Sequence, residues 1–244
     1  MEHTGIISSS VEQTDKDVVG KFVDKFVANY NKQIDTPYII GVYGGSCSGK
    51  SFVSVVIQKT ITQIFKSKCS DVVIISQDSY YKGGNADTNY DKPESIDFDL
   101  LLEHMEMLFS GKSVKIPIYD FKTHQRKKQT ITVNKAKIII VEGILICTNE
   151  KLRNYFNMKI FIFAGEALQF ARRLSRDINQ RGRSIEEVKK RYFRDVTHSY
   201  NQHVLPSAQY ADMTINNNGD DNYVGLEMVL HHIIVVLNKV CKDE

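Results

Sequence analysis

The sequence has few cysteines, and they lie too far apart for the sites that cysteines usually build. The four of them, at positions 47, 69, 147 and 241, form no Cys-x-x-Cys pair and have no histidine at metal-ligand spacing. A zinc site or a disulfide framework is therefore not expected.

The chain also has little net charge and no long apolar run. Lys and Arg number 32 against 29 Asp and Glu, a net charge of +3 that is too weak to indicate nucleic-acid binding. No apolar segment reaches the roughly 20 residues that cross a bilayer, and the N-terminus lacks the features of a secretory signal. We expect no nucleic-acid or membrane partner and a cytoplasmic location.

The length of 244 residues suits one large domain, and the pattern after Pro37 predicts an α/β fold. Short runs rich in β-branched residues alternate with helix-length segments, as in parallel sheets covered by helices on both faces. Ser184 and Glu187 form a capping box at the start of one helix. The expected strands are 39–43, 72–76, 138–141, 160–163 and 213–215, and the expected helices include 50–68, 98–109 and 185–203.

Residues 1–36 form an extension before this domain, which we place at 37–244. Within the extension, Val18, Phe22, Phe26 and Tyr30 recur at helical spacing. They predict an amphipathic helix that packs on the main body. A membrane-binding or partner-docking helix is the alternative.

A second departure from the alternation lies at about 113–134. Residues 114–119 and 129–133 have the pattern of two strands separated by a polar, basic loop, which predicts an inserted β-hairpin. Such a hairpin covers a ligand or is a surface flap, and the pattern does not decide between the two.

The stretch GGSCSGKS fits the template G-x-x-x-x-G-K-[ST] and lies between an expected strand and an expected helix. Backbone N–H groups in such a P-loop face phosphates at a helix N-terminus. Lys50 is expected to reach the β- and γ-phosphates, and Ser51 to offer its hydroxyl to Mg²⁺. No Asn-Lys-x-Asp motif follows, which argues against a GTPase. The predicted nucleotide site comprises Gly44, Gly45, Ser46, Cys47, Ser48, Gly49, Lys50, Ser51 and Phe52.

Two carboxylates follow expected strands, where ligand chemistry gathers in α/β sheets. Asp78 follows the second strand and is placed to orient or deprotonate an attacking hydroxyl; a helix cap or turn is its alternative role. Glu142 follows the third strand and is a candidate ligand for Mg²⁺. Together beside a P-loop they favour a metal–nucleotide active site.

Five arginines lie within residues 171–183, around Gly182. Such a run is a solvated helix face, a nucleic-acid patch or a movable lid that brings positive charge to a transferring phosphoryl group.

These segments together resemble the uridine-cytidine kinase family of P-loop kinases. The resemblance covers about 37–238 and rests on the P-loop together with QDSYYK (77–82), YDKPESIDFDLL (90–101), IPIYDFKTHQR (116–126), VEGIL (141–145), ARRLSRDINQRGR (171–183) and LPSAQYADMTI (205–215). It implies a P-loop NTPase fold with a five-stranded parallel sheet, the inserted hairpin and an arginine-rich lid at about 171–184.

The resemblance also implies roles for individual residues. Asp78 would be the base toward a nucleoside 5′-hydroxyl, with Ser51 and Glu142 serving Mg²⁺. Tyr81 and Asp91 would hold the ribose. Tyr119 and His124 would stack on the pyrimidine and hydrogen-bond to it. The lid contacts to substrate and ATP would come from Arg173, Arg176, Arg181 and Arg183, of which Arg173 and Arg176 would be catalytic. Asp220 would lie on the adenine side.

The chain departs from the family pattern at three places, one of which is a short segment between Tyr81 and Tyr90. Residues 163–169 read FAGEALQ where relatives have an aspartate-rich stretch with an arginine, and Arg191 stands where a glutamine contacting the base is expected. We assign Arg191 to the substrate side.

The expected activity is ATP- and Mg²⁺-dependent phosphorylation of the 5′-hydroxyl of uridine and cytidine in pyrimidine salvage, by a homotetramer as the family implies. The alternatives are a related kinase for another small hydroxyl acceptor and a catalytically silent nucleotide-binding protein.

Overall fold

The computed structural model describes residues 13–30, 36–65, 72–85, 87–219 and 223–240. The chain divides into two units, residues 1–35 and 36–244. In the first unit, helix α1 (Gln13–Tyr30) spans the predicted amphipathic stretch. Its packing on the second unit stays a prediction.

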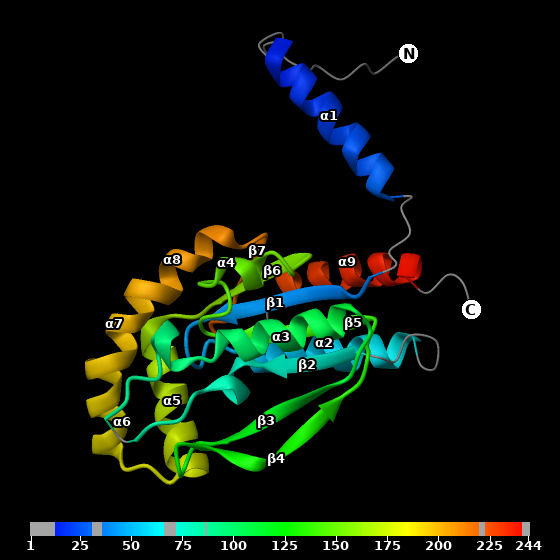
Figure 1. The fold of residues 1–244 in the computed structure, drawn as a ribbon. Helices are drawn as coiled ribbons and strands as arrows, with labels where there is room; N and C mark the ends of the chain where they lie inside the picture. The colour runs from blue at the N-terminus through cyan, green and yellow to red at the C-terminus, as the bar shows by residue number, and fades with distance from the viewer. Residues whose placement is uncertain (1–12, 31–35, 66–71, 86, 220–222, 241–244) are drawn as a thin grey trace. The chain divides into compact units, whose positions relative to one another are not determined.

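The second unit is built on a five-stranded sheet in which every neighbouring pair is parallel (Figure 1). The strand order is β2-β5-β1-β6-β7, so the strand before the P-loop lies at the centre. The predicted α/β class and five-stranded parallel sheet are confirmed. The strands are β1 (Tyr38–Gly44), β2 (Val72–Ser76), β5 (Ile138–Gly143), β6 (Met158–Phe163) and β7 (Met213–Asn216).

Helices cover both faces of the sheet, because side chains that alternate along a strand are buried on either side. On one face, Ile39 and Tyr43 share a core with α3 (Phe98–Phe109). On the other, Ile40 and Val42 are buried on the side of α2 (Lys50–Phe65) and α9 (Val224–Val240), which contact each other. The P-loop therefore leaves a β1 strand that is packed on both faces.

The arginine-rich segment forms most of helix α5 (Glu166–Arg181), which ends at Gly182. Gly182 adopts a left-handed conformation with φ 66°, and its N–H donates to the carbonyl of Asp177 as a helix C-cap. Helix α6 (Ile185–Arg191) follows, and Ser184 and Glu187 form the predicted capping box. The segment predicted as a lid thus lies in a 16-residue helix that a glycine turn joins to the short helix α6.

The helical stretch that follows α6 is interrupted by two π-helical turns. Residues 192–196 and 200–204 are π-helical and flank α7 (Thr197–Ser199), before α8 (Leu205–Ser207) and a 3₁₀ turn at Ala208–Tyr210. The predicted helix over 185–203 is therefore helical throughout but not regular. Single π-turns inside helices are frequent at functional sites.

The predicted hairpin consists of β3 (Val114–Asp120) and β4 (Gln125–Val133), which pair antiparallel. The expected polar loop was too long, because Gln125–Lys128 already belong to β4. β4 is exposed or half-buried along its whole length, but Thr130–Val133 are β-branched, whereas Gln125–Lys128 include no β-branched residue and so lack that strand signal. The register shifts between Pro117 and Tyr119, which turns the end of β3.

Three short helical segments complete the unit. The 3₁₀ turns η1 (Gln77–Tyr80) and η2 (Pro93–Ser95) lie between β2 and α3, and α4 (Glu150–Arg153) lies between β5 and β6. Among the helices that the structure describes, none is both long and apolar enough to cross a membrane.

Candidate active site

A cavity of about 330 Å³ opens at the carboxyl ends of β1, β2 and β5, between the hairpin and the α5–α6 segment. It contains the P-loop, the segments that follow β2 and β5, the end of the hairpin and the lid arginines. The predicted site residues that line it are Ser46, Cys47, Gly49, Lys50, Ser51, Phe52, Asp78, Tyr81, Asp91, Tyr119, His124, Glu142, Arg173, Arg176, Arg181, Arg183 and Arg191.

The P-loop is held from behind by neighbouring backbone and side chains. Gly44 has φ 144°, and a Cβ there would collide with the carbonyl oxygen of Ile162. Gly49 has φ 106°, and a Cβ there would meet the amide of Asn217, which donates to the carbonyl of Ser48 at 2.8 Å. Glycine is required at both positions because the backbone is left-handed and the space is filled. The loop shape is therefore fixed by β6 and by the residues after β7.

Lys50 lies at the first residue of α2 and is buried. Its Nζ donates to the carbonyl of Gly45 at 2.8 Å, which folds the side chain back across the loop. Burial lowers the pKa of Lys50, while Glu142 and Asp78 act in the opposite direction. A lysine held over the loop in this way presents its ammonium to anything the loop binds.

Glu142 accepts hydrogen bonds from two serines. Ser51 Oγ donates to Oε2 at 3.1 Å, and Ser76 Oγ donates to Oε1 at 2.7 Å. Glu142 is buried, with 8% of its surface exposed. The two candidate metal ligands, Ser51 and Glu142, are thus adjacent, and Ser76 fixes the carboxylate from the other side.

Asp78 lies in η1, directly after β2. Ser76 caps this turn by accepting from the Asp78 N–H at 3.3 Å. Burial and then the charge of Glu142 raise the pKa of the Asp78 carboxyl, against Arg181, Lys50 and Arg176, which lower it. A carboxylate with a raised pKa beside a phosphate-binding loop is suited to accept a proton.

Four arginines of the lid surround one buried aspartate, Asp177. Its carboxylate oxygens lie 2.8 Å from Arg176, 3.3 Å from Arg181, 2.9 Å from Arg183 and 3.7 Å from Arg173. Burial raises the pKa of Asp177, but the arginines outweigh it and hold that pKa below its ordinary value. Asp177 itself has no exposed surface. It therefore acts as a common anchor for side chains that line the cavity.

Two of these arginines also contact other parts of the site. Arg173 donates to Ser46 Oγ in the P-loop at 3.0 Å. The guanidinium of Arg181 lies 3.9 Å from the ring centroid of Phe121 at the end of the hairpin, a cation–π contact. The lid is thus connected at one end to the phosphate loop and at the other to the hairpin.

Aromatic side chains line the hairpin end of the cavity. The ring of Tyr81 lies 5.2 Å from Tyr119, which in turn lies 5.2 Å from Phe121. Tyr90 stacks on His124 with 5.2 Å between centroids and 10° between planes. His124 has φ 57°, a left-handed turn conformation that histidine tolerates. This end offers flat rings and few charges to a ligand.

The charge around His124 comes from the lid. Burial lowers the pKa of His124, and Arg191, Arg183 and Arg181 lower it further, so the imidazole is neutral at pH 7. Within the described part of the chain, Arg191 makes no hydrogen bond or ion pair. Arg191 lines the cavity and is one of the charges that act on His124.

Asp91 lies between the aromatic end and the phosphate end. Burial raises the pKa of its carboxyl, with Asp195 and Asp78 acting in the same direction and Arg173 and Arg176 opposing them. Thr88 and Tyr90, from the same segment as Asp91, line the cavity with it.

The unusual stretch 163–169 supports the P-loop. Gln169 is buried, and its Nε2 donates to the carbonyl of Ala164. A Cβ on Gly45 would collide with the Gln169 amide, so Gln169 packs directly against the loop. Asp220, which the resemblance places near adenine, lies outside the described residues.

Sequence reasoning missed several residues of this site. Tyr90 and Phe121 line the cavity beside the predicted Asp91 and Tyr119, and each adjoins a predicted motif as an additional aromatic residue. Asp177 stands among five arginines in the sequence, and that excess of positive charge was the available signal for a buried acid. Thr88 and Asp195 also line the cavity, and no motif in the sequence marks either of them.

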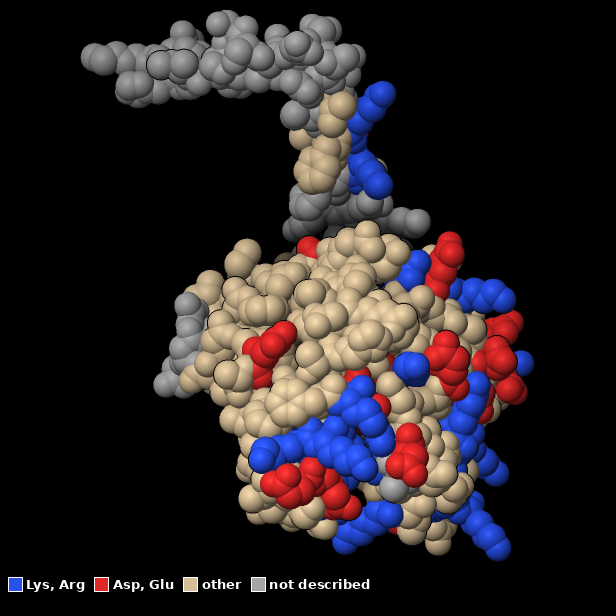
Figure 2. All heavy atoms as spheres, turned by 90° about the vertical axis from the view of Figure 1, so that its left-hand side faces the viewer, with Lys and Arg blue, Asp and Glu red and all other residues tan. Residues whose placement is uncertain are grey.

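The outer surface near the lid carries both signs of charge. Figure 2 shows a band of Lys and Arg side chains with Asp and Glu beside it, next to a broad area with few charges. Such mixing agrees with the small net charge and does not form the uninterrupted basic stripe of a nucleic-acid surface.

Comparison with known proteins gives consistent matches. The family model "Phosphoribulokinase / Uridine kinase family" matches residues 39–223. The uridine kinase of Lactobacillus johnsonii is 39% identical over 215 residues, which are 85% of this chain and 99% of that protein. The chloroplastic uridine/cytidine kinase UKL1 of Arabidopsis thaliana is 39% identical over 216 residues, 84% of this chain, but this chain spans only 43% of its length.

A solved structure shows the same fold. The crystal structure of a putative fructose transport system kinase from Silicibacter has a TM-score of 0.62 at 17% identity, covering 80% of this chain and 97% of that one. At this identity the likeness concerns the fold alone.

Proposed function

The chain belongs to the phosphoribulokinase/uridine kinase family, and we propose that it transfers the γ-phosphoryl group of ATP to the 5′-hydroxyl of uridine, and of cytidine, in pyrimidine salvage. The name of the bacterial relative supports uridine as the acceptor, and the name of the plant relative supports cytidine as well.

One observation carries the proposal: a single cavity joins a phosphate-binding loop to an aromatic pocket, and the carboxylate of Asp78 lines the same cavity. Lys50 marks the phosphate end, Tyr119 marks the aromatic end, and Asp78 lines the wall shared by both. A flat pyrimidine among the rings would place its sugar toward Asp78 and Asp91. An acceptor without a flat ring, such as a phosphorylated sugar, would leave the aromatic end unused.

The reaction is an in-line displacement at phosphorus. The 5′-oxygen of the nucleoside forms a bond to the γ-phosphorus as the bond to the β,γ-bridging oxygen breaks, and ADP leaves. Asp78 accepts the hydroxyl proton, for which its raised pKa is suited. Catalysis comes mainly from positioning and from positive charge around the transferring group, which Lys50, Arg173 and Arg176 supply.

The residues present fit a magnesium ion. Among the described residues, no three His, Cys, Asp or Glu side chains gather into a metal cluster. Mg²⁺ bound with ATP needs only one or two protein ligands, because phosphates and water complete its octahedron. Ser51 and Glu142, whose oxygens are 3.1 Å apart, would hold it. When bound, it would neutralise charge on the β- and γ-phosphates.

The remaining parts of the proposal follow the family resemblance. Tyr81 and Asp91 hold the ribose, His124 and Arg191 contact the base edge, and the α5–α6 segment closes over the phosphates. We also propose a homotetramer and a cytoplasmic location.

The test is an ADP-release assay with Mg-ATP and a panel of acceptors. With uridine or cytidine, the amount of ADP released should be proportional to the amount of acceptor added. No ADP should be released with adenosine, ribulose 5-phosphate or pantothenate, or when the acceptor is left out. ADP release without any acceptor, or with the sugar phosphate alone, would replace the proposal with an ATPase or a different kinase.

A further inference from the structure

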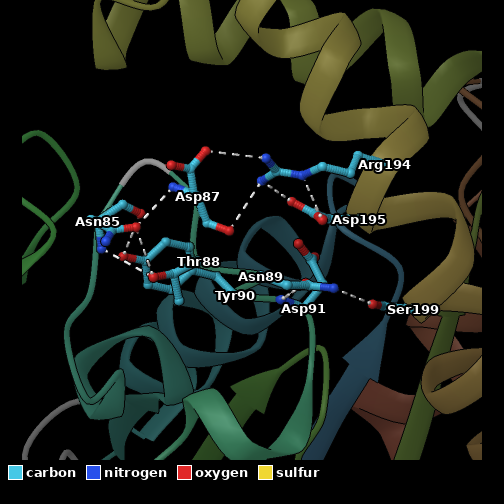
Figure 3. A network of polar contacts seen from close by, with 9 residues as sticks. All are labelled: Asn85, Asp87, Thr88, Asn89, Tyr90, Asp91, Arg194, Asp195 and Ser199. Carbon is cyan, nitrogen blue, oxygen red and sulfur yellow. Dashed lines mark hydrogen bonds and ion pairs between the residues drawn. The ribbon is translucent and has the colours of Figure 1, made fainter.

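The side chain of Asn89, whose neighbours Thr88, Tyr90 and Asp91 line the cavity, makes two hydrogen bonds in opposite directions (Figure 3). Its Oδ1 accepts from the backbone N–H of Asp91 at 2.9 Å. Its Nδ2 donates to Ser199 Oγ at 3.2 Å. Asn89 therefore connects the backbone of Asp91, whose carboxyl lines the cavity, to the helical stretch that follows α6.

The far end of this link is rigid. Ser199 has no exposed surface and lies in α7, between the two π-helical turns at 192–196 and 200–204. A π-turn inserts one extra residue into a helix and so rotates the side chains that follow. The two turns bracket the residue that receives the bond from Asn89, and its burial leaves the hydroxyl little freedom to move.

A second tie joins the same two segments but does not reach Asp91. Asp87 pairs with Arg194 at 3.5 Å, and Arg194 also pairs with Asp195 at 2.6 Å (Figure 3). Asp87 is 86% exposed in its side chain, so this ion pair is worth little. The chain thus offers two connections between the same elements, only one of which contacts Asp91.

The carboxyl of Asp91 needs such support. It lines the cavity, it has acidic neighbours in Asp78 and Asp195, and it is balanced by Arg173 and Arg176. Without a fixed backbone, a carboxylate in this position would be free to turn toward the arginines and away from the cavity.

We propose that Asn89 is a positioning residue for the sugar site: bound to Ser199, it holds the Asp91 backbone so that the Asp91 carboxylate faces a ribose hydroxyl. This inference rests on the proposed function, since it is the nucleoside that supplies the ribose. Asn89 does not touch the substrate and acts through Asp91.

The test compares variants of the full-length chain in steady-state kinetics. Asn89→Ala should lower kcat/KM for uridine about tenfold, mainly through KM, and leave the KM for ATP unchanged. Ser199→Ala should give a similar loss. The double variant should be no worse than the poorer single one, because residues that act as one unit are not additive.

Two further comparisons separate positioning from a general loss of structure. Asn89→Ser keeps a short side chain that can accept the Asp91 N–H but cannot reach Ser199, and it should behave like Asn89→Ala. Asp87→Asn removes the exposed tie between the same segments and should match the wild type. Thermal unfolding of each variant shows whether the fold is intact.

A nucleoside that lacks the ribose hydroxyl facing Asp91 separates the positioning role of Asn89 from a purely structural role. Only a positioning role makes the effect of Asn89→Ala depend on that hydroxyl. The deoxyuridine to use is 2′-deoxyuridine or 3′-deoxyuridine, whichever is the poorer substrate of the wild type. With it, the kcat/KM of Asn89→Ala should be at most about twofold below that of the wild type. Four outcomes would each overturn the inference. Two are wild-type kinetics in Asn89→Ala or Asn89→Ser and additive losses in the double variant. The others are a loss in Asp87→Asn equal to that in Asn89→Ala and an equal loss with both deoxyuridines. An absence of uridine turnover in the wild type would instead overturn the proposed function.

Discussion

Ser51 in the P-loop helix donates a 3.1 Å hydrogen bond to Glu142 at the end of β5, and so joins the two residues that we expect to serve Mg²⁺. Glu142 is also the largest charged contribution that raises the pKa of Asp78. One carboxylate therefore affects both the metal side of the site and its base.

This dual position gives the first prediction, for Glu142→Gln. The neutral amide should raise the Mg²⁺ concentration needed for half-maximal activity, because a charged oxygen ligand is lost. It should also move the acidic limb of the kcat/KM profile to lower pH, because a negative neighbour of Asp78 is removed. Ser76→Ala, which removes a hydrogen bond from Glu142 but no charge, should move the acidic limb much less. An unchanged Mg²⁺ requirement would remove Glu142 from the metal side.

The second prediction concerns Asp78 as the base. Asp78→Asn should lower kcat by about 10²- to 10⁴-fold, the usual contribution of a general base, while ATP still binds. Nucleotide binding measured by calorimetry is the control. Activity near that of the wild type would show that another group accepts the proton.

The same substitution should stabilise the fold at neutral pH. The pKa of Asp78 is raised by burial, so the folded state binds its proton more tightly than the unfolded state does. Ionising Asp78 therefore costs the folded state stability. This cost is absent below the ordinary aspartate pKa of about 3.9 and is complete only above the pKa of Asp78 in the folded state. Asp78→Asn should therefore melt at a higher temperature than the wild type at pH 7.5, with a gap that closes toward pH 4. Equal melting temperatures at pH 7.5 would contradict this.

The third prediction tests the aromatic end. Tyr119→Ala should weaken nucleoside binding by about 1 to 3 kcal/mol, since the ring offers a face to the base. This corresponds to a roughly 5- to 150-fold higher KM for uridine. Tyr119→Phe keeps the ring and should retain most of the affinity, and the KM for ATP should not change in either variant. A KM for uridine that is the same in Tyr119→Ala and the wild type would remove the hairpin from the substrate site.

The fourth prediction concerns the anchor of the arginines. Asp177→Asn should lower the free energy of unfolding by about 3 to 5 kcal/mol, because it leaves buried arginines without their counter-charge. Glu186→Gln breaks the exposed pair with Lys189 and should cost less than about 1 kcal/mol. Chemical denaturation of both variants measures the difference.

The contribution of Asp177 to the free energy of unfolding depends on pH in the opposite direction to that of Asp78. The arginines hold the folded pKa of Asp177 below its ordinary value, so its contribution is present above about pH 3.9 and is lost as the pH falls through the folded pKa. The gap between wild type and Asp177→Asn should be full at pH 7 and shrink below about pH 4. A gap that grows on acidification would contradict the assignment.

The sequence predicted the centre of the sheet well because the strands there are buried on both faces. β1 and β5 are buried along their whole length, and such strands appear as short runs of Val and Ile. The first half of β4 was missed because Gln125–Lys128 include no β-branched residue, unlike Thr130–Val133 in the same exposed strand. The π-turns could not be predicted, because they leave no period that differs from an ordinary helix over so few residues.

The site was predicted where a motif or a strand end marked it. Lys50, Asp78 and Glu142 were found because a P-loop and two strand ends converge at one edge of the sheet. Asp177 and Asn89 were not found. Both act through other residues, so their importance depends on burial and hydrogen-bond partners that appear only in the folded chain.

The most direct test of the account follows the label from γ-³²P-ATP in the presence of uridine or 5′-deoxyuridine. The account predicts labelled uridine 5′-monophosphate from uridine, and no labelled product from 5′-deoxyuridine, which should still inhibit competitively with uridine. Label on another hydroxyl, or label released as inorganic phosphate at the same rate with and without uridine, would contradict transfer to the 5′-hydroxyl.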